Sequence, residues 1–216
     1  MKRYARSFDG VCLDMTNVNT YLREKCKGIT CEVKIVKLFN DCCHSGLLQK
    51  DYGKDMDCTL TSITDLLMMK FQGIFEDTNA AYKEVEAVAS AYGYNGDKTG
   101  TNPLTINSIM KQILLNHKIP CKTKAKYIKE LPLIGWNKND IIKNIQCGVP
   151  VILNIFKDGR KYYDNHTILV VGYCTYIVGD EEITMLLVHD NWHKNICLVD
   201  YDLLCISSIN YLFDFL

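Results

Sequence analysis

The chain has 216 residues, 48% of them hydrophobic, and its 25 basic side chains are balanced by 25 acidic ones. A single globular unit of this size buries enough surface to form a core without metal ions or disulfides. The absence of net charge and of any basic run excludes the electrostatic footprint of a nucleic-acid-binding protein, so we expect no nucleic-acid partner.

Apolar runs and cysteine content indicate where the protein works. No apolar run approaches the about 18 residues of a membrane-spanning helix, and the opening MKRYARSFDG has no apolar stretch of the kind found in secretory signals. The 11 cysteines are an odd number in a chain that needs no staples, which favours reduced thiols. We therefore expect a cytoplasmic protein that does not enter a membrane, with one cysteine available for catalysis.

The first half of the chain is predicted to be mainly helical. Thr20–Asn40 has no clear period and is either helix or strand, and residues 45–57 form a polar loop. From Cys58 onward, apolar residues recur at the three- to four-residue spacing of a buried helix, and Asp57 stands at its N-cap position. Three more helices are expected, over Ala80–Tyr92, Thr105–His117 and Lys138–Cys147. We expect the lysine cluster of Lys122, Lys124 and Lys126 to be a solvated face.

After Gly148 the pattern changes to short runs rich in β-branched and aromatic residues, which predict strands. These runs are Pro150–Phe156, Thr167–Cys174, Ile183–His189, Ile196–Val199 and Tyr211–Phe215. Helices followed by strands favour an α+β fold with segregated layers over an alternating parallel sheet.

A cysteine and a histidine fall where a thiol nucleophile and its base would be expected. Cys58 opens a buried helix, and the partial positive charge at a helix N-terminus favours a thiolate. His166 stands immediately before the apolar strand TILVVGYC, where it could take the thiol proton.

Partners for both groups are also present. The strand that ends at His189 runs into Asp190, Asn191 and Trp192, so a carboxylate or an amide could accept the second imidazole N–H while the indole shields that bond. Upstream, the Gln49 side chain could join the Cys58 backbone N–H in holding an oxyanion. Together these groups predict acyl transfer through a thioester.

From residue 47 to the C-terminus the sequence resembles papain-like cysteine peptidases. The resemblance rests on the order of five features: a Gln, a Cys at a helix start, a Gly-hydrophobic-Pro step, the strand HTILVVGY, and an Asp near a Trp. The closest likeness is to the bacterial branch that includes bacteriocin leader peptidases. The resemblance implies an α+β fold with an N-terminal helical lobe packed against a C-terminal antiparallel β-sheet lobe. We divide the single domain, 1–216, into an extension (1–44), a helical lobe (45–147) and a β lobe (148–216).

The resemblance also implies roles: Cys58 as nucleophile, His166 as general base, Asp190 as the residue that orients it, and Gln49 as the oxyanion residue. Two features depart from the family pattern. CTLTS replaces the frequent Cys-Gly-Pro-Thr-Ser, and Gln49 lies nine residues before the cysteine instead of about six.

The sequence therefore predicts a hydrolase that cleaves a peptide or isopeptide bond in a peptide or protein substrate. Two alternatives remain: an acyltransferase with the same triad, and a binding module without turnover, which the missing Gly-Pro would favour. No cofactor is implied. The cysteines and histidine at 26, 31, 42, 43 and 44 lack the usual spacing of a zinc site, so we expect no metal.

Overall fold

A computed structural model of the chain describes residues 18–25, 32–38, 48–49, 56–71, 73–96, 98–127, 138–156, 163, 165–178 and 181–213. Its α-helices are α1 (Val18–Lys25), α2 (Cys58–Lys70), α3 (Thr78–Ala91), α4 (Ile106–Asn116) and α5 (Lys138–Gln146). Its strands are β1 (Glu32–Leu38), β2 (Lys122–Tyr127), β3 (Val151–Ile155), β4 (His166–Val178), β5 (Glu181–His189), β6 (Cys197–Asp200) and β7 (Ile206–Phe213). Short 3₁₀ turns, η2 (Pro103–Thr105) and η3 (Tyr201–Leu203), precede α4 and follow β6.

The strands form a seven-stranded sheet in the order β2-β7-β3-β4-β5-β6, with β1 as an additional partner of β4. All the pairs are antiparallel. The long strand β4 pairs with β3 over His166–Val170 and then with β1 over Gly172–Ile177. The α+β fold with an antiparallel sheet, predicted from the sequence, is confirmed.

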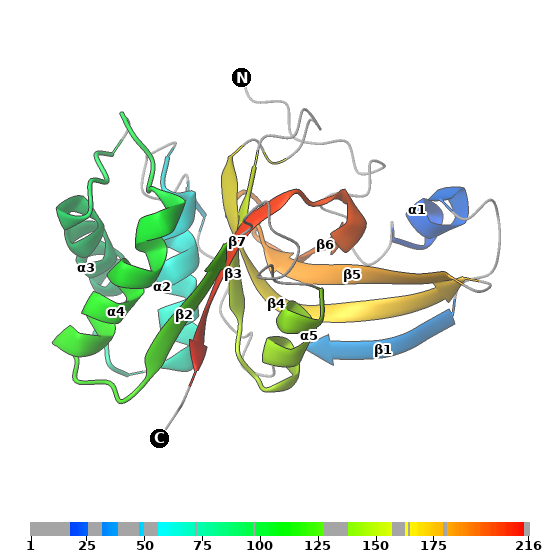
Figure 1. Ribbon diagram of the computed structural model, residues 1–216, viewed down its shortest axis with the longest axis horizontal. Helices are drawn as coiled ribbons and strands as arrows, with labels where there is room; N and C mark the ends of the chain where they lie inside the picture. Colours follow the sequence, from blue (N-terminus) through cyan, green and yellow to red (C-terminus); the bar gives the residue numbers. More distant parts are fainter. Residues whose placement is uncertain are drawn as a thin grey trace.

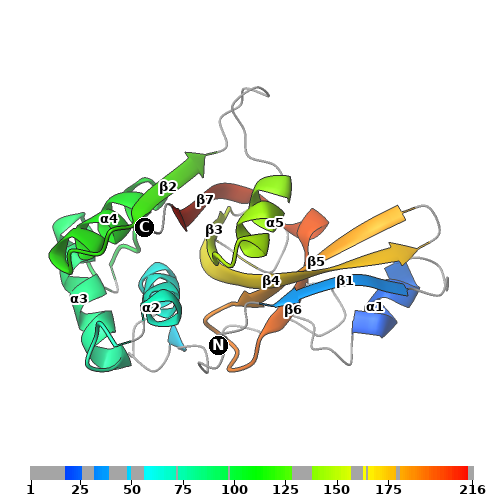
Figure 2. The ribbon, with the colours of Figure 1, turned by 90° about the horizontal axis from the view of Figure 1, so that it is seen from below.

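Helix α2 lies between α3 and the sheet, α4 packs on α3 and against β2, and α5 packs beside β3 and β4 (Figures 1 and 2). Because both of its sides are covered, nearly every residue of α2 is buried, including several with polar side chains. The hydroxyls of Thr61 and Thr64 are satisfied within the helix, since they donate to the carbonyls of Asp57 and Leu60 at 2.9 Å. The first turn of α2 is thus held rigidly inside the molecule.

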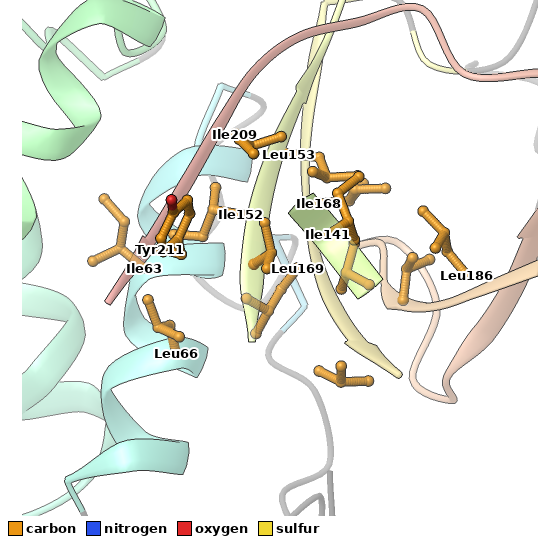
Figure 3. Close-up of a cluster of buried hydrophobic side chains, with 14 of the residues drawn as sticks. Ile63, Leu66, Ile141, Ile152, Leu153, Ile168, Leu169, Leu186, Ile209 and Tyr211 are labelled. Atoms are coloured by element: carbon orange, nitrogen blue, oxygen red, sulfur yellow. The ribbon is translucent and has the colours of Figure 1, made fainter. Parts of the chain in front are cut away.

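The core joins the helices to the sheet. Ile63 and Leu66 of α2 lie on one side of β3, and Ile141 of α5 lies on the other (Figure 3). These three side chains and Ile152 of β3 are 0% exposed. Such close packing fixes α2 against β3 and β4, which carry the residues opposite Cys58.

Four predicted helices are confirmed within one or two residues at each end. Asp57 is the N-cap residue of α2, as predicted, but its side chain makes no capping hydrogen bond. By contrast Asp77, which the sequence analysis did not single out, caps α3 by accepting from the Ala80 N–H at 2.7 Å.

The lysine cluster, expected to be only a solvated face, forms the edge strand β2 paired with β7. Lys122 and Lys124 are exposed while Thr123 and Ala125, which follow them in turn, are less so, and this is the period-two alternation of a half-buried strand. Helices and strands are therefore not segregated along the chain as expected. β1 lies between α1 and α2, and β2 between α4 and α5, yet both belong to the same sheet as the later strands.

The described N-terminal residues belong with the sheet. Within the unassigned stretch Thr20–Asn40, α1 ends at Lys25 and β1 pairs with β4. The Tyr21 hydroxyl donates to Asp200 at 2.6 Å, and Lys25 pairs with the same carboxylate. Helix α1 thus attaches to the start of η3, far from α2 (Figure 1). Likewise α5, which we assigned to a helical lobe, contacts the sheet.

Candidate active site

The nucleophile candidate Cys58 is the first residue of α2 and is a free, half-buried thiol. Burial would raise the pKa of this thiol. The hydrogen bond and charge of His166, and hydrogen bonds from the Thr167 backbone and side chain, outweigh burial and lower the pKa to about 7. The structure thus brings Cys58 and His166 together, 108 positions apart in the chain, and a substantial thiolate fraction exists near neutral pH.

His166 is the first residue of β4, and its ring packs against two aromatic side chains that also contact each other. It stacks on Trp192 at 4.0 Å between ring centroids and on Tyr163 at 5.3 Å. Its Nε2 lies 2.7 Å from the backbone carbonyl oxygen of Asp190. Because a carbonyl can only accept, Nε2 carries the proton, and the contact with the thiol falls to Nδ1.

The position of Asp190 differs in detail from the expectation. We expected its carboxylate to accept the imidazole N–H, but the backbone carbonyl of Asp190, just after the end of β5, takes this bond. The fully buried carboxylate instead accepts from the backbone N–H of Trp192 at 3.1 Å, and from the N–H and the Nδ1 of His193 at 2.9 and 2.6 Å. Asp190 therefore fixes the loop that carries the indole over His166.

Two titratable groups border this carboxylate. The hydrogen bond to Asp190 raises the pKa of His193, and burial only partly opposes the rise. Burial, followed by the charge of Asp190, raises the pKa of Tyr163 well above its usual range. Tyr163 thus stays neutral beside His166, and the sequence analysis missed it because nothing in its turn distinguishes it from other loop tyrosines.

Asn191, the alternative to Asp190 from the sequence, occupies another position in the site. Its backbone is in the left-handed region, with φ at 64°, which turns its side chain toward α2. The amide Nδ2 lies 3.0 Å from the carbonyl oxygen of Cys58, 2.8 Å from that of Thr167 and 2.9 Å from the Ser62 hydroxyl. It therefore ties α2, which begins at Cys58, to β4, which begins at His166.

Gln49 lies at the site despite its unusual spacing. It is 6% exposed, its backbone N–H donates to the carbonyl of Asn191 at 3.0 Å, and its Oε1 accepts from the Trp192 indole at 3.1 Å. This bond fixes the orientation of the amide, with its oxygen toward Trp192. Gln49 thus contacts the residues that follow β5, Asn191 and Trp192.

A further polar contact under the site was missed by the sequence analysis. The Thr167 hydroxyl lies 2.8 Å from that of Thr59 on α2, and it accepts from Asn154 of β3 at 2.8 Å. The signal available in the sequence was a threonine directly after His166 at the head of an otherwise apolar strand. Thr167 completes the contact between β4 and the first turn of α2.

The group of potential metal ligands beside the site is unsuited to a metal ion. Among the described residues, ligand atoms of Asp190, His193 and Cys197 lie within 4.8 Å of one another. However, Cys197 is disulfide-bonded and offers no thiolate, and the carboxylate is already occupied by N–H donors. The expectation of reduced thiols thus fails for Cys197, although Cys58, Cys121, Cys147, Cys174 and Cys205 are free. The cysteines and histidine weighed as zinc ligands, at 26, 31 and 42–44, lie outside the described residues.

Comparison with known proteins gives one family. No curated protein matches the chain. No described helix is long and apolar enough to cross a membrane. Residues 47–198, well over half of the chain, match the Peptidase_C39 like family. The matched range includes every site residue named above. The chain therefore belongs to the Peptidase_C39-like family of papain-like cysteine peptidases, as its sequence resemblance implied.

Proposed function

We propose that this protein is an active cysteine peptidase that cleaves a peptide or isopeptide bond through a thioester on Cys58. The observation that carries the proposal is a free thiol at the start of a buried helix whose pKa is lowered to about 7 by His166. A binding module without turnover has no need of an activated thiol, so this lowered pKa favours the enzyme.

In the proposed acylation step, Nδ1 of His166 takes the Cys58 proton and the thiolate attacks the substrate carbonyl carbon. The C=O π electrons move onto oxygen, where the Cys58 backbone N–H and the Gln49 side-chain amide stabilise the developing charge. The C–N bond then breaks, and the imidazolium gives its proton to the leaving amine.

Deacylation uses the same groups. His166 takes a proton from water, the hydroxide attacks the thioester carbonyl, and the C–S bond breaks to release the acid and the Cys58 thiolate. Throughout, the carbonyl of Asp190 holds Nε2–H, and the rings of Trp192 and Tyr163 keep the imidazole in one orientation. In this mechanism the backbone carbonyl of Asp190 orients His166, and the Asp190 carboxylate supports the loop that carries Trp192.

A site-resolved labelling experiment tests the proposal. The folded protein is treated with iodoacetamide at pH 6, and the modified cysteines are quantified by mass spectrometry against time. The exposed Cys147 and Cys205 serve as reference thiols in the same sample. We expect half-buried Cys58 to react faster than both references, and equal or slower labelling of Cys58 would contradict an activated nucleophile.

A further inference from the structure

The residue directly before the nucleophile is a buried carboxylate with an unusual set of partners. Asp57 is 0% exposed. Its Oδ2 accepts from the hydroxyl of Tyr82 on α3, and its Oδ1 accepts from the hydroxyl of Tyr94, which follows the same helix. Both tyrosines are themselves at most 5% exposed. Two tyrosine hydroxyls, one on α3 and one just after it, thus hold this carboxylate.

An aspartate in this position normally behaves differently. The side chain of an N-cap aspartate usually folds back and accepts from the N–H groups of the first helical turn. Asp77 does so for α3 and Asp200 does so for η3. Asp57 does not: its backbone carbonyl accepts from the Thr61 N–H at 2.9 Å, while its side chain makes no capping bond.

The difference matters because α2 begins with the nucleophile. Uncapped N–H groups of a first turn carry the partial positive charge that stabilises an anion at a helix N-terminus. A carboxylate folded onto these groups would occupy them and would place a negative charge beside the thiolate. In this position ordinary capping would therefore oppose catalysis.

We propose that Tyr82 and Tyr94 are positioning residues that hold the Asp57 carboxylate away from the N-terminus of α2, and so reserve its first-turn N–H groups for the Cys58 thiolate and the substrate oxyanion. The inference rests on the proposed function, because it assigns a role beside the same nucleophile. It adds to that function three residues that do not touch the reacting atoms.

The test combines removal of the two hydroxyls with removal of the carboxylate. In the full chain carrying Tyr82→Phe and Tyr94→Phe, Asp57 is released and can cap α2. A like charge next to a thiol raises its pKa by about one to two units. The lost thiolate at pH 6 outweighs the greater nucleophilicity of the more basic thiolate, so iodoacetamide labelling of Cys58 should slow about three- to tenfold. Adding Asp57→Ala to these two substitutions removes the capping group and should restore the rate to within about twofold of the native value.

Rescue by the third substitution separates this role from ordinary packing. If the hydroxyls only stabilised the fold, Asp57→Ala would add to the loss instead of reversing it. Tyr127→Phe is the matched control, since the Tyr127 hydroxyl bonds the Leu104 carbonyl at 3.3 Å on the exposed edge strand β2. We expect it to label at the native rate.

Two results would overturn the proposal: an unchanged Cys58 rate in the Tyr82→Phe, Tyr94→Phe variant, or a slowed rate that Asp57→Ala does not restore. Circular dichroism shows whether each variant is folded, and should the double variant unfold, Tyr82→Phe and Tyr94→Phe are compared singly, each with and without Asp57→Ala. A native Cys58 that labels no faster than Cys147 and Cys205 would contradict the peptidase function. The comparison among variants would still decide what the tyrosines do.

Discussion

Replacing His166 by alanine tests the coupling between base and nucleophile, because this side chain lowers the Cys58 pKa through both a hydrogen bond and its charge. Without it, burial still raises the pKa of the thiol and the Thr167 hydrogen bonds still lower it, and we expect the pKa to return from about 7 toward the ordinary value of 9.0. The two proteins should therefore differ in their pH profiles and not only in rate.

The size of the effect follows from the thiolate fraction and its reactivity. At pH 6 a thiol with a pKa of about 7 is roughly 9% ionised, and one with a pKa of 9 is roughly 0.1% ionised. A more basic thiolate is a better nucleophile, by about 6- to 10-fold for two pKa units with the Brønsted slope of thiolate attack on disulfides. The His166→Ala variant should thus label about tenfold more slowly at pH 6 and several-fold faster at pH 10, with the curves crossing near pH 8.

Site-resolved iodoacetamide labelling from pH 5 to 10 measures both curves. His117→Ala is the matched control, since His117 pairs with Glu84 on α3 at 2.7 Å and makes no contact with Cys58. We expect this control to follow the native curve. A His166→Ala profile that superimposes on the native one would refute the assignment of His166 as the group that activates the thiol.

Four further predictions concern neighbouring residues. Cys58→Ser should abolish peptide hydrolysis without changing the melting temperature, whereas Cys147→Ser should retain it; turnover by the serine variant in a peptidase assay would exclude Cys58 as nucleophile. Asp190→Asn should label Cys58 at nearly the native rate, because the backbone carbonyl holds His166, while Asp190→Ala loosens the loop and slows labelling; a severe loss in the asparagine variant would return the orienting role to the carboxylate. Asn191→Ala removes the amide donor that lies within reach of the Cys58 and Thr167 carbonyls and should cost about 1 to 3 kcal/mol in urea unfolding, against a small change for Asn144→Ala within α5. Burial lowers the pKa of His189 to about 4, and the Asp190 charge offsets this only in part. Because the pKa of an unfolded histidine is higher, about 6.5, the contribution of neutral His189 to stability is present above pH 6.5, and the free energy of unfolding falls by about 3 kcal/mol on acidification to pH 4. Unfolding curves of His189→Leu should no longer show this loss.

The sequence alone determined the fold class, the positions of four helices and the nucleophile candidate. These features depend on local pattern: three- to four-residue periodicity predicted α2, and a cysteine at its first turn followed from that prediction. Position along the chain, together with the family resemblance, pointed to His166 and Gln49; the structure places His166 beside Cys58 and Gln49 beside Trp192. Strand β2 escaped prediction because its alternating lysines match a solvated surface as well as an edge strand.

The tertiary structure decided how each polar group is used. Asp190 and Asn191 are adjacent, and although the sequence placed the end of the strand at His189, it could not show that Asn191 adopts a positive φ or that a backbone carbonyl holds His166. Asp57 has the residue type and the place of an N-cap, yet its bonding is set by two tyrosines that are 25 and 37 positions away in the chain. Helix periodicity is a property of neighbouring residues, whereas the partner of a buried polar group depends on which distant donors the packed core brings within reach.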